Sequence, residues 1–372
     1  MHTHVEPVQT ARQMREFIRL PFALYRDDPH FVPPLLSERR RFFSAANPLF
    51  EFTEVGYFLA RDEHGRVIGR VTGHVNRRHN EFHGEQIGFF GFFECVRDPT
   101  VATALLGAAE QWVRARGMTA IRGPFNFSTN EECGFLARGF ERPPVIMMTY
   151  SPQFYLEFME PAGYRKVREL LAYEYHSPDR AVPEYLERAS RIVRARTGVT
   201  VRPFQPARFA AEVATAFRLY NAAWERNWGF VPMTEAEFHY AARELRPLLD
   251  PEIALFAEHA GRPIAFSLAL PDYNQVLRHM RGRLLPWGWV RFLRGRRHIH
   301  HVRVILLGVL PEYRGRGIDT LLYHETFRRG LARGYWSCEM SWILEDNLTM
   351  RRALERMGAQ VTKVYHIYEK TL

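Results

Sequence analysis

The sequence has no long hydrophobic run. None of its apolar stretches approaches the roughly 20 residues that a helix needs to cross a bilayer, and its start, MHTHVEPVQT, lacks the apolar core of a secretory signal. Neither membrane insertion nor export is therefore expected. We predict a cytoplasmic protein.

Cysteine is scarce as well. Cys95, Cys133 and Cys338 are the only three in 372 residues, and no two of them have the C-x-x-C spacing. An odd and scattered set of this kind argues against a disulfide framework and against a cysteine-rich zinc site. We expect reduced thiols and no structural metal.

Acidic residues are missing from one long interval, between Asp272 and Glu312. That interval holds eight arginines: Arg278, Arg281, Arg283, Arg291, Arg294, Arg296, Arg297 and Arg303. Three aromatic residues, Trp287, Trp289 and Phe292, lie among them. The pattern predicts that segment 278–301 contacts an anionic partner such as a membrane surface, but a solvated insertion whose rings pack on the domain would look the same. Nucleic acid is disfavoured, because one segment rather than a whole face carries the charge.

The length of 372 residues exceeds the roughly 250–300 at which single cores stop growing. Internal similarity points the same way. YFLARDEHGRVIG from Tyr57 resembles IALFAEHAGRPIA from Ile253, and AGYRKVRELLAYE ending at Glu174 resembles MGAQVTKVYHIYE ending at Glu369. A duplication is the simplest explanation. We predict two domains, 1–177 and 178–372.

Each half reads as a strand hairpin, a strand, a helix, a strand, a helix and a strand. This order predicts an α/β fold in which helices flank a mixed sheet. The first half contains an insertion, FNFSTNEECGFLARGFERPP, that is rich in turn formers. Its residues Asn126, Asn130 and Glu131 are candidates for binding a polar substrate, or they cap a turn and a helix.

The stretch HVRVILLGVLPEYRGRGIDTLL contains a buried strand, a proline, a turn with two glycines and the start of a helix. Glycines let successive N–H groups point into one concavity, and the helix adds its positive end, so the arrangement suits a pyrophosphate. A helix start without any ligand is the alternative. The candidate binding residues are Val309, Leu310, Arg314, Gly315, Arg316, Gly317, Ile318, Asp319 and Thr320.

The order of these elements resembles the GNAT superfamily of acyl-CoA-dependent N-acyltransferases. The residues that carry the resemblance are VLPEYRGRGI, 309–318, and EDNLTMRRALERMGA, 345–359. Within the superfamily, nearly the whole chain is similar to a bacterial family with two GNAT-like domains in tandem. The resemblance implies that acetyl-CoA or another acyl-CoA binds the glycine turn and Asn347 as co-substrate. It also implies an amine acceptor, a small molecule or a peptide, held between the two halves.

The first half lacks the glycine turn, because its strand IGFFGFFECV continues into RDPTVATALL. The resemblance therefore implies a degenerate GNAT-like domain without a pyrophosphate loop. Such a domain would shape the acceptor cleft or serve only as a structural partner.

The catalytic groups of the family are not at their usual places. Many GNAT enzymes carry a glutamate base on the strand before the loop, but 301–310 contains no carboxylate. Glu339, on the polar side of the alternating strand WSCEMSWIL, is our candidate for the base, although a glutamate satisfied by an arginine is the common alternative. Leu354 replaces the tyrosine that often acts as general acid. Asp319 replaces the usual small residue of the loop.

The sequence thus predicts an acyl-CoA-dependent N-acyltransferase with its coenzyme in the second half. The missing tyrosine, the missing strand glutamate and Asp319 favour the alternative, a non-catalytic protein that binds acyl-CoA or an anionic surface.

Overall fold

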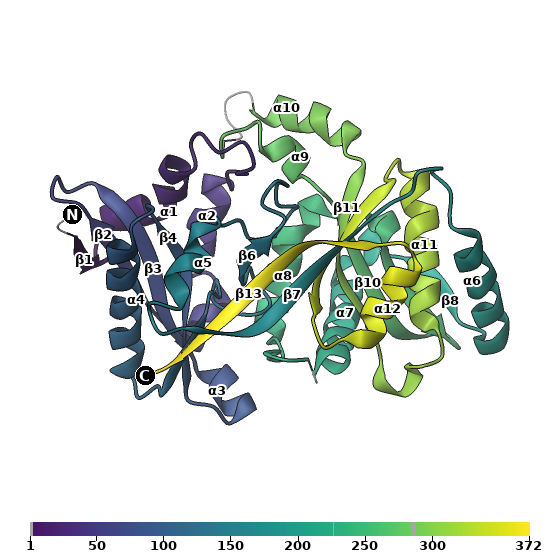
Figure 1. Ribbon diagram of the computed structural model, residues 1–372. Coiled ribbons are helices and arrows are strands. Elements are labelled where there is room, and N and C mark those ends of the chain that lie inside the picture. Colours follow the sequence, from purple (N-terminus) through teal and green to yellow (C-terminus); the bar gives the residue numbers. More distant parts are fainter. Residues whose placement is uncertain (1–2, 226, 284–287) are drawn as a thin grey trace. The chain divides into compact units, whose positions relative to one another are not determined.

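The computed structural model describes residues 3–225, 227–283 and 288–372 (Figure 1). The chain forms two compact units. The first unit comprises Met1–Leu171, Leu277–Phe292 and Lys363–Leu372, and the second comprises Ala172–Val276 and Leu293–Thr362. Because each unit has its own packing, the two are described separately.

The strands of the first unit are β1 (His4–Pro7), β2 (Thr53–Arg61), β3 (Val67–Asn76), β4 (Ile87–Cys95), β5 (Ala120–Gly123) and β6 (Phe135–Arg138). Its helices are α1 (Ala11–Leu24), α2 (Leu36–Phe42), α3 (Arg77–His83), α4 (Pro99–Arg114) and α5 (Phe154–Met159), with a 3₁₀ helix at Pro48–Glu51. Two long strands, β7 (Arg165–His176) and β13 (Gln360–Thr371), have residues in both units.

The strands of the second unit are β8 (Thr200–Pro203), β9 (Ala254–His259), β10 (Arg262–Pro271), β11 (His301–Val309) and β12 (Ser337–Leu344). Its helices are α6 (Glu184–Thr197), α7 (Phe209–Trp224), α8 (Glu235–Leu245), α11 (Ile318–Ala332) and α12 (Leu348–Arg356). The helices α9 (Asn274–Leu277) and α10 (Gly288–Gly295) lie between β10 and β11, and 3₁₀ helices occupy Pro206–Arg208, Arg246–Leu248, Pro251–Ile253, Arg296–His298 and Pro311–Tyr313.

The two units repeat one order of elements. In the first, the hairpin β2–β3 is followed by β4, α4, β5, α5 and β7; in the second, β9–β10 is followed by β11, α11, β12, α12 and β13. In each, the third of these strands is antiparallel to the hairpin and parallel to the strand that follows the helix. The mixed α/β architecture predicted from the sequence is confirmed.

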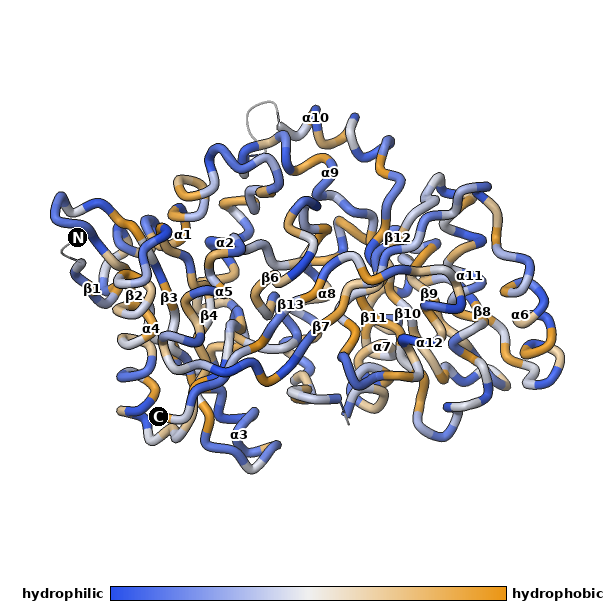
Figure 2. The backbone as a smooth tube through the Cα atoms, viewed as in Figure 1, coloured by the Kyte–Doolittle hydropathy of each residue, from blue (hydrophilic) through white to orange (hydrophobic). Residues whose placement is uncertain are grey.

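In the first unit, α4 covers one face of the sheet, alongside β2 and β3 (Figure 1). Its apolar stripe, which includes Leu105, Leu106, Ala109 and Val113, is almost completely buried. This stripe recurs with the helical period, so one side of α4 faces the sheet and the other faces solvent. In Figure 2 the tube of α6 in the second unit likewise changes between hydrophilic and hydrophobic residues along its length. The buried residues of α6 are Leu186, Ser190 and Val193.

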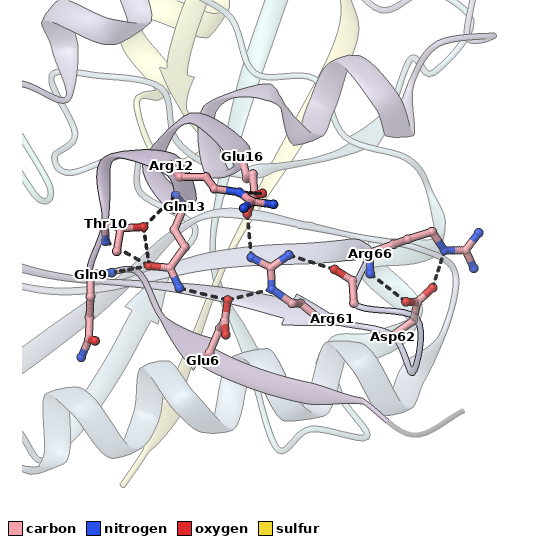
Figure 3. A network of polar contacts seen from close by, with 10 residues as sticks. Glu6, Gln9, Thr10, Arg12, Gln13, Glu16, Arg61, Asp62 and Arg66 are labelled. Carbon is pink, nitrogen blue, oxygen red and sulfur yellow. Dashed lines mark hydrogen bonds and ion pairs between the residues drawn. The ribbon is translucent and has the colours of Figure 1, made fainter.

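Polar contacts fix α1 against the hairpin of the first unit (Figure 3). The helix begins with a capping box, in which the Thr10 side chain accepts from the N–H of Gln13 and the Gln13 side chain accepts from the N–H of Thr10. The guanidinium of Arg61 on β2 donates to Glu6 at 2.7 Å and to Glu16 at 2.6 Å. One arginine therefore ties the first strand, the first helix and the hairpin together.

The last ten residues of the chain belong to the first unit. Within β13, Tyr368 pairs with Gly123 and Thr371 pairs with Ala120 of β5, while His366 pairs with Phe135 of β6. The Lys370 ammonium also donates to both carboxylate oxygens of Glu110, at 2.9 and 2.8 Å. These bonds explain why the compact units differ from two contiguous domains divided at residue 177: the C-terminal strand completes the sheet of the N-terminal unit, and the units change at Leu171.

In each unit, a β-bulge lies between the second strand of the hairpin and the strand that follows it. Between β3 and β4 the register shifts between Arg70 and Thr72, which leaves one extra residue on β4 near Phe92, whose φ is 48°. Between β10 and β11 it shifts between Leu268 and Ala269, which leaves Ile305 as the extra residue on β11. A bulge bends its strand and disrupts the ladder locally.

In the first unit the space beyond the bulge is filled by the chain itself. Gly123 and Pro124 carry the backbone across β4, where the N–H of Phe125 donates to the carbonyl of Phe90 at 2.8 Å. A Cβ on Gly91 would lie 1.8 Å from the Phe125 carbonyl oxygen. Residue 91 must therefore be glycine for the backbone at 125 to approach so closely.

We predict that Gly91→Ala destabilises the protein by at least about 3 kcal/mol, because the backbone rather than a side chain has to move. Gly107→Ala is the matched control: this helical glycine of α4 has nothing within 4 Å of an added Cβ. Gly107→Ala should raise the free energy of unfolding by about 0.5–1 kcal/mol. Urea denaturation followed by circular dichroism measures both. Equal midpoints for the two variants would contradict the close approach at Gly91.

Candidate functional site

The strands β11 and β12 of the second unit diverge from each other. They pair in parallel from His301 and Ser337 to Val304 and Met340, and in the described part of the chain their ladder ends there. The bulge residue Ile305 comes next on β11. Since a bulged strand bends, the backbone groups of β11 on the side of β12 lose their strand partners beyond this point. The result is a gap between two strand ends.

The glycine turn follows β11 after the short 3₁₀ helix Pro311–Tyr313. Gly315 and Gly317 have φ angles of 71° and 79°, which only glycine adopts without strain. Gly317 is the N-cap of α11 and has no side chain with which to cap the helix, so the first N–H groups of α11 are not closed off by their own cap residue. An added Cβ on Gly315 would meet nothing within 4 Å. The turn is open on the side of Gly315.

The arginines of the turn hold its shape. The Arg314 guanidinium donates to the carbonyls of Val309 at 3.2 Å and Ala223 at 2.6 Å. The carbonyl of Arg316 accepts from Arg196 of α6 at 2.8 Å, while its own guanidinium lies over the Tyr313 ring. Both arginine side chains remain exposed at the surface. They thus fix the loop and also leave positive charge beside it.

Asp319 lies in the first turn of α11. Among residues 3–225, 227–283 and 288–372 its carboxylate has no hydrogen-bond partner, so it does not occupy the N–H groups of the helix start. A carboxylate at this place is attracted by the helix dipole but repels a bound anion. Arg314 and Arg316 offset that repulsion.

A buried polar cluster lies at the origin of the gap. Glu339 on β12 is 1% exposed, and its carboxylate accepts from the Ser341 hydroxyl at 2.8 Å. Arg303, its register partner on β11, is 2% exposed and donates to the same hydroxyl at 3.1 Å and to the Ser341 carbonyl at 3.2 Å. The Nδ1 atom of His301 and the Ser337 hydroxyl are 2.8 Å apart. Ser341 therefore links the Glu339 carboxylate to the Arg303 guanidinium.

The sequence analysis found Glu339 but missed Arg303 and His301. The signal was available: in the run HVRVILLGV, the two polar residues are spaced by two and so share one face of a strand. The Glu339 carboxylate accepts from Ser341, and it lies where the gap begins. Its role as a base stays a prediction.

Cys338, which precedes Glu339, is not a nucleophile at neutral pH. Burial raises the pKa of its thiol to about 12, because the charged thiolate would lose its hydration. The side chain faces away from Glu339, on the side of the sheet that α11 covers.

Asn347 and Leu354 lie at α12 and are the remaining positions of the second unit that the sequence analysis discussed. Asn347 is the N-cap of α12, and its side chain accepts from the N–H of Met350 at 3.2 Å. Leu354 is 1% exposed and belongs to the core. The contact of Asn347 with a coenzyme therefore remains a prediction, since the observed bond is a helix cap.

The predicted substrate-binding residues of the first unit form hydrogen bonds within their own loop and to β4. The Asn126 side chain accepts from the N–H of Phe92 at 2.8 Å and donates to Glu132 at 2.9 Å. The N–H groups of Asn130 and Glu131 donate to the hydroxyl and the carbonyl of Ser128. Asn126 thus supports the bulge of β4, and substrate binding by these three residues stays a prediction.

The first unit contains a second buried carboxylate, which sequence reasoning missed. Glu94 on β4 accepts from the hydroxyls of Tyr25 and Tyr155, and the guanidinium of Arg70 lies 3.7 Å away. Burial raises the pKa of Glu94, and the positive charge of Arg70 opposes that rise. Because the chain fills the neighbouring gap with Phe125, this network serves the packing of the unit.

Two features are absent from the residues that the structure describes. No group of three or more His, Cys, Asp or Glu side chains there could hold a metal ion. Nor does any helix in the described ranges combine the length and the apolarity that a membrane span requires.

The bulged strand, the gap, the glycine turn and the helix start together define an acyltransferase of the GNAT type. Residues 213–359 match the acetyltransferase (GNAT) family, a range that includes the turn and Glu339. The chain belongs to this family and is an N-acyltransferase. The resemblance stated from the sequence is thereby confirmed.

Two bacterial relatives match almost the whole chain. Protein YghO of Escherichia coli (strain K12) is 36% identical over 365 residues, which cover 96% of this chain and 93% of the relative. The bacterial ceramide synthase of Caulobacter vibrioides (strain NA1000 / CB15N) is 35% identical over 380 residues, which cover 99% of this chain and 97% of the relative.

Solved structures show the same fold over the full length. The tandem GNAT protein from the clavulanic acid biosynthesis pathway has a TM-score of 0.58 at 13% identity, covering 100% of this chain and 98% of that one. A GCN5-related N-acetyltransferase from Sphaerobacter thermophilus has a TM-score of 0.56 at 17% identity, with coverages of 99% and 95%. These likenesses concern the fold, and they confirm the tandem arrangement of two GNAT-like halves.

Proposed function

We propose that the protein transfers the acyl group of an acyl-CoA to the amino group of a lipid-like acceptor. The observation that carries the proposal is the gap between β11 and β12, which has an open glycine turn at one end and the buried Glu339 cluster at its origin. The relative named bacterial ceramide synthase supports a long-chain amine as acceptor and a fatty acyl group as donor.

The chain offers a place for each part of an acyl-CoA. The N–H groups around Gly315, Gly317 and Ile318 suit a pyrophosphate, because the turn is open and the helix start carries no side-chain cap. In the described chain the ladder of β11 with β12 ends before Ile305, so N–H groups on that side of β11 suit the thioester oxygen, on which negative charge develops during attack by an amine. An acyl-CoA supplies the activated thioester.

Glu339 accepts the proton of the attacking amine in this proposal. A buried carboxylate beside the gap is within the class of groups that act as general bases, and Ser341, itself contacted by Arg303, donates to it. Leu354 stands where a tyrosine acid is common, so water or another side chain protonates the leaving thiolate.

The segment 278–301 supports a contact with an anionic membrane surface. In α10, Trp289 and Leu293 are 49% and 42% exposed and lie one helical turn apart. Arg291 and Arg294 lie away from that apolar stripe and are exposed. Such a helix settles at a membrane interface, where lipid substrates would be met. Trp287 lies outside the described residues, and Arg303 belongs to the buried cluster.

The coenzyme assignment predicts that Gly315→Val raises the Kd for CoA by about tenfold or more, because a forced change of φ removes at least one charge-assisted hydrogen bond. Gly261→Val is the matched control, since Gly261 has a φ of 77° and also has nothing within 4 Å of an added Cβ. Calorimetric titration measures both. If the two variants bound CoA equally well, the turn would not be the pyrophosphate site.

The reaction itself is tested by release of free CoA thiol from acyl-CoA in the presence of long-chain amines. Glu339→Gln should lower kcat by about 10²- to 10⁴-fold while the affinity for acyl-CoA stays unchanged, because the base acts on the acceptor. Gln retains an oxygen that can accept from Ser341. An unaltered rate and pH profile in this variant would remove Glu339 from the mechanism.

The membrane contact predicts co-sedimentation with phosphatidylglycerol vesicles that weakens as salt is raised. Replacing Arg291, Arg294, Arg296 and Arg297 by Gln should reduce vesicle affinity by about tenfold or more, and Trp289→Ser should reduce it at high salt as well. Sedimentation with RNA is the comparison. Binding to RNA instead of vesicles, or to neither, would leave the segment without a membrane role.

A further inference from the structure

The glycine turn is contacted by a helix that lies outside the part of the chain matching the family. Residues 213–359 match the GNAT family, whereas α6 spans Glu184–Thr197 and precedes that range. Within the second unit, α6 packs on α11. The Arg194 guanidinium of α6 donates to the buried carboxylate of Glu325 on α11 at 3.2 Å. The last turns of α6 are therefore fixed against the helix that follows the glycine turn.

Two residues near the end of α6 contact the turn itself. Val193 is buried, and its Cγ2 atom would lie 2.9 Å from a Cβ added to Gly317. Three residues further on, the Arg196 guanidinium donates to the main-chain carbonyl of Arg316 at 2.8 Å. Residues three apart are neighbours on a helix surface, so both contacts come from one side of α6. That side of α6 supports the turn.

The bond from Arg196 determines where an N–H group of the turn points. The carbonyl of Arg316 and the N–H of Gly317 belong to one peptide group, and this peptide is trans. In a planar trans peptide, the C=O and the N–H point in opposite directions. Because the carbonyl is directed at Arg196, the N–H of Gly317 is directed away from α6.

The N–H groups of the turn have no acceptor in the described protein. Within residues 3–225, 227–283 and 288–372, the N–H groups of Gly315, Arg316 and Gly317 donate to no carbonyl and to no side chain. Successive main-chain N–H groups in a turn bind anions. These donors are thus available to a phosphate group, and their direction decides how well they meet it.

We propose that Arg196 is a positioning residue for CoA, because it holds the Arg316–Gly317 peptide so that the Gly317 N–H donates to the pyrophosphate. The inference rests on the proposed function for the place of the pyrophosphate. Without Arg196 the peptide group can rotate, and the donor loses its fixed direction. The loss falls on the affinity for the coenzyme, since the pyrophosphate takes no part in acyl transfer.

The test is the Kd of CoA, measured by calorimetry on the full chain and on three variants. Arg196→Ala should raise the Kd by about three- to tenfold, which corresponds to one hydrogen bond. Arg196→Lys keeps a donor on a long side chain and should restore most of the affinity. Arg188→Ala is the matched control, because this exposed arginine of α6 donates to Glu184 rather than to the turn. It should leave the Kd unchanged.

Dephospho-CoA identifies which phosphate is involved. It retains the pyrophosphate and lacks the 3′-phosphate, so Arg196→Ala should raise its Kd by the same factor as that of CoA. A loss confined to CoA would assign Arg196 to the 3′-phosphate and overturn the proposal. Thermal unfolding without ligand should give the same midpoint for Arg196→Ala and Arg188→Ala. A lower midpoint for Arg196→Ala, without rescue of CoA affinity by Arg196→Lys, would make the bond a purely structural one and overturn the proposal too.

Salt distinguishes positioning from a direct contact between Arg196 and a phosphate. The bond of Arg196 goes to a neutral carbonyl, so the ratio of the two Kd values, Arg196→Ala over the unaltered protein, should persist at about 0.5 M NaCl. A ratio that falls to one would indicate a screened ion pair and overturn the positioning role. An unchanged Kd in Arg196→Ala would overturn this inference alone, whereas failure of the unaltered protein to bind CoA would overturn the proposed function.

Discussion

One extra residue in one strand organises the second unit. Ile305 breaks the register of β11 against β10, and the parallel ladder with β12 ends one residue earlier, at Val304. The gap is thus a consequence of a single backbone irregularity, and the buried polar cluster lies where the gap begins.

The first unit carries the same irregularity, but its own chain occupies the space beside the bulge. It has a bulge at the corresponding place, but its own backbone at Phe125 enters the gap and Asn126 satisfies the N–H of Phe92. Gly91 makes the approach possible. The unit also lacks the glycine turn, so the loss of the loop and the filling of the gap go together. The two units thus share one order of elements, and in the first unit the backbone itself occupies the space beside the bulge.

Much of this could be predicted from the sequence, and the rest could not for definite reasons. The order of elements follows from apolar periodicity and the turn from its two glycines, because both are local properties. Arg303 was missed as the partner of Glu339, since cross-strand neighbours depend on register. The bulge at Ile305 has no residue signature, because an isoleucine is an ordinary strand residue. The pairing of the C-terminal strand was not predicted, because two similar halves suggest contiguous domains. In the structure, β13 pairs with β5 of the first unit.

The route of β13 gives the protein an order of assembly. During synthesis, the N-terminal unit emerges first, yet its strand β5 has no antiparallel partner until residues 363–372 have been made. An unpaired edge is a surface on which other chains can add a strand. The sheet of the first unit therefore remains incomplete while the second unit is translated. Tyr368 and Lys370 therefore complete the first unit only after the second unit has been synthesised.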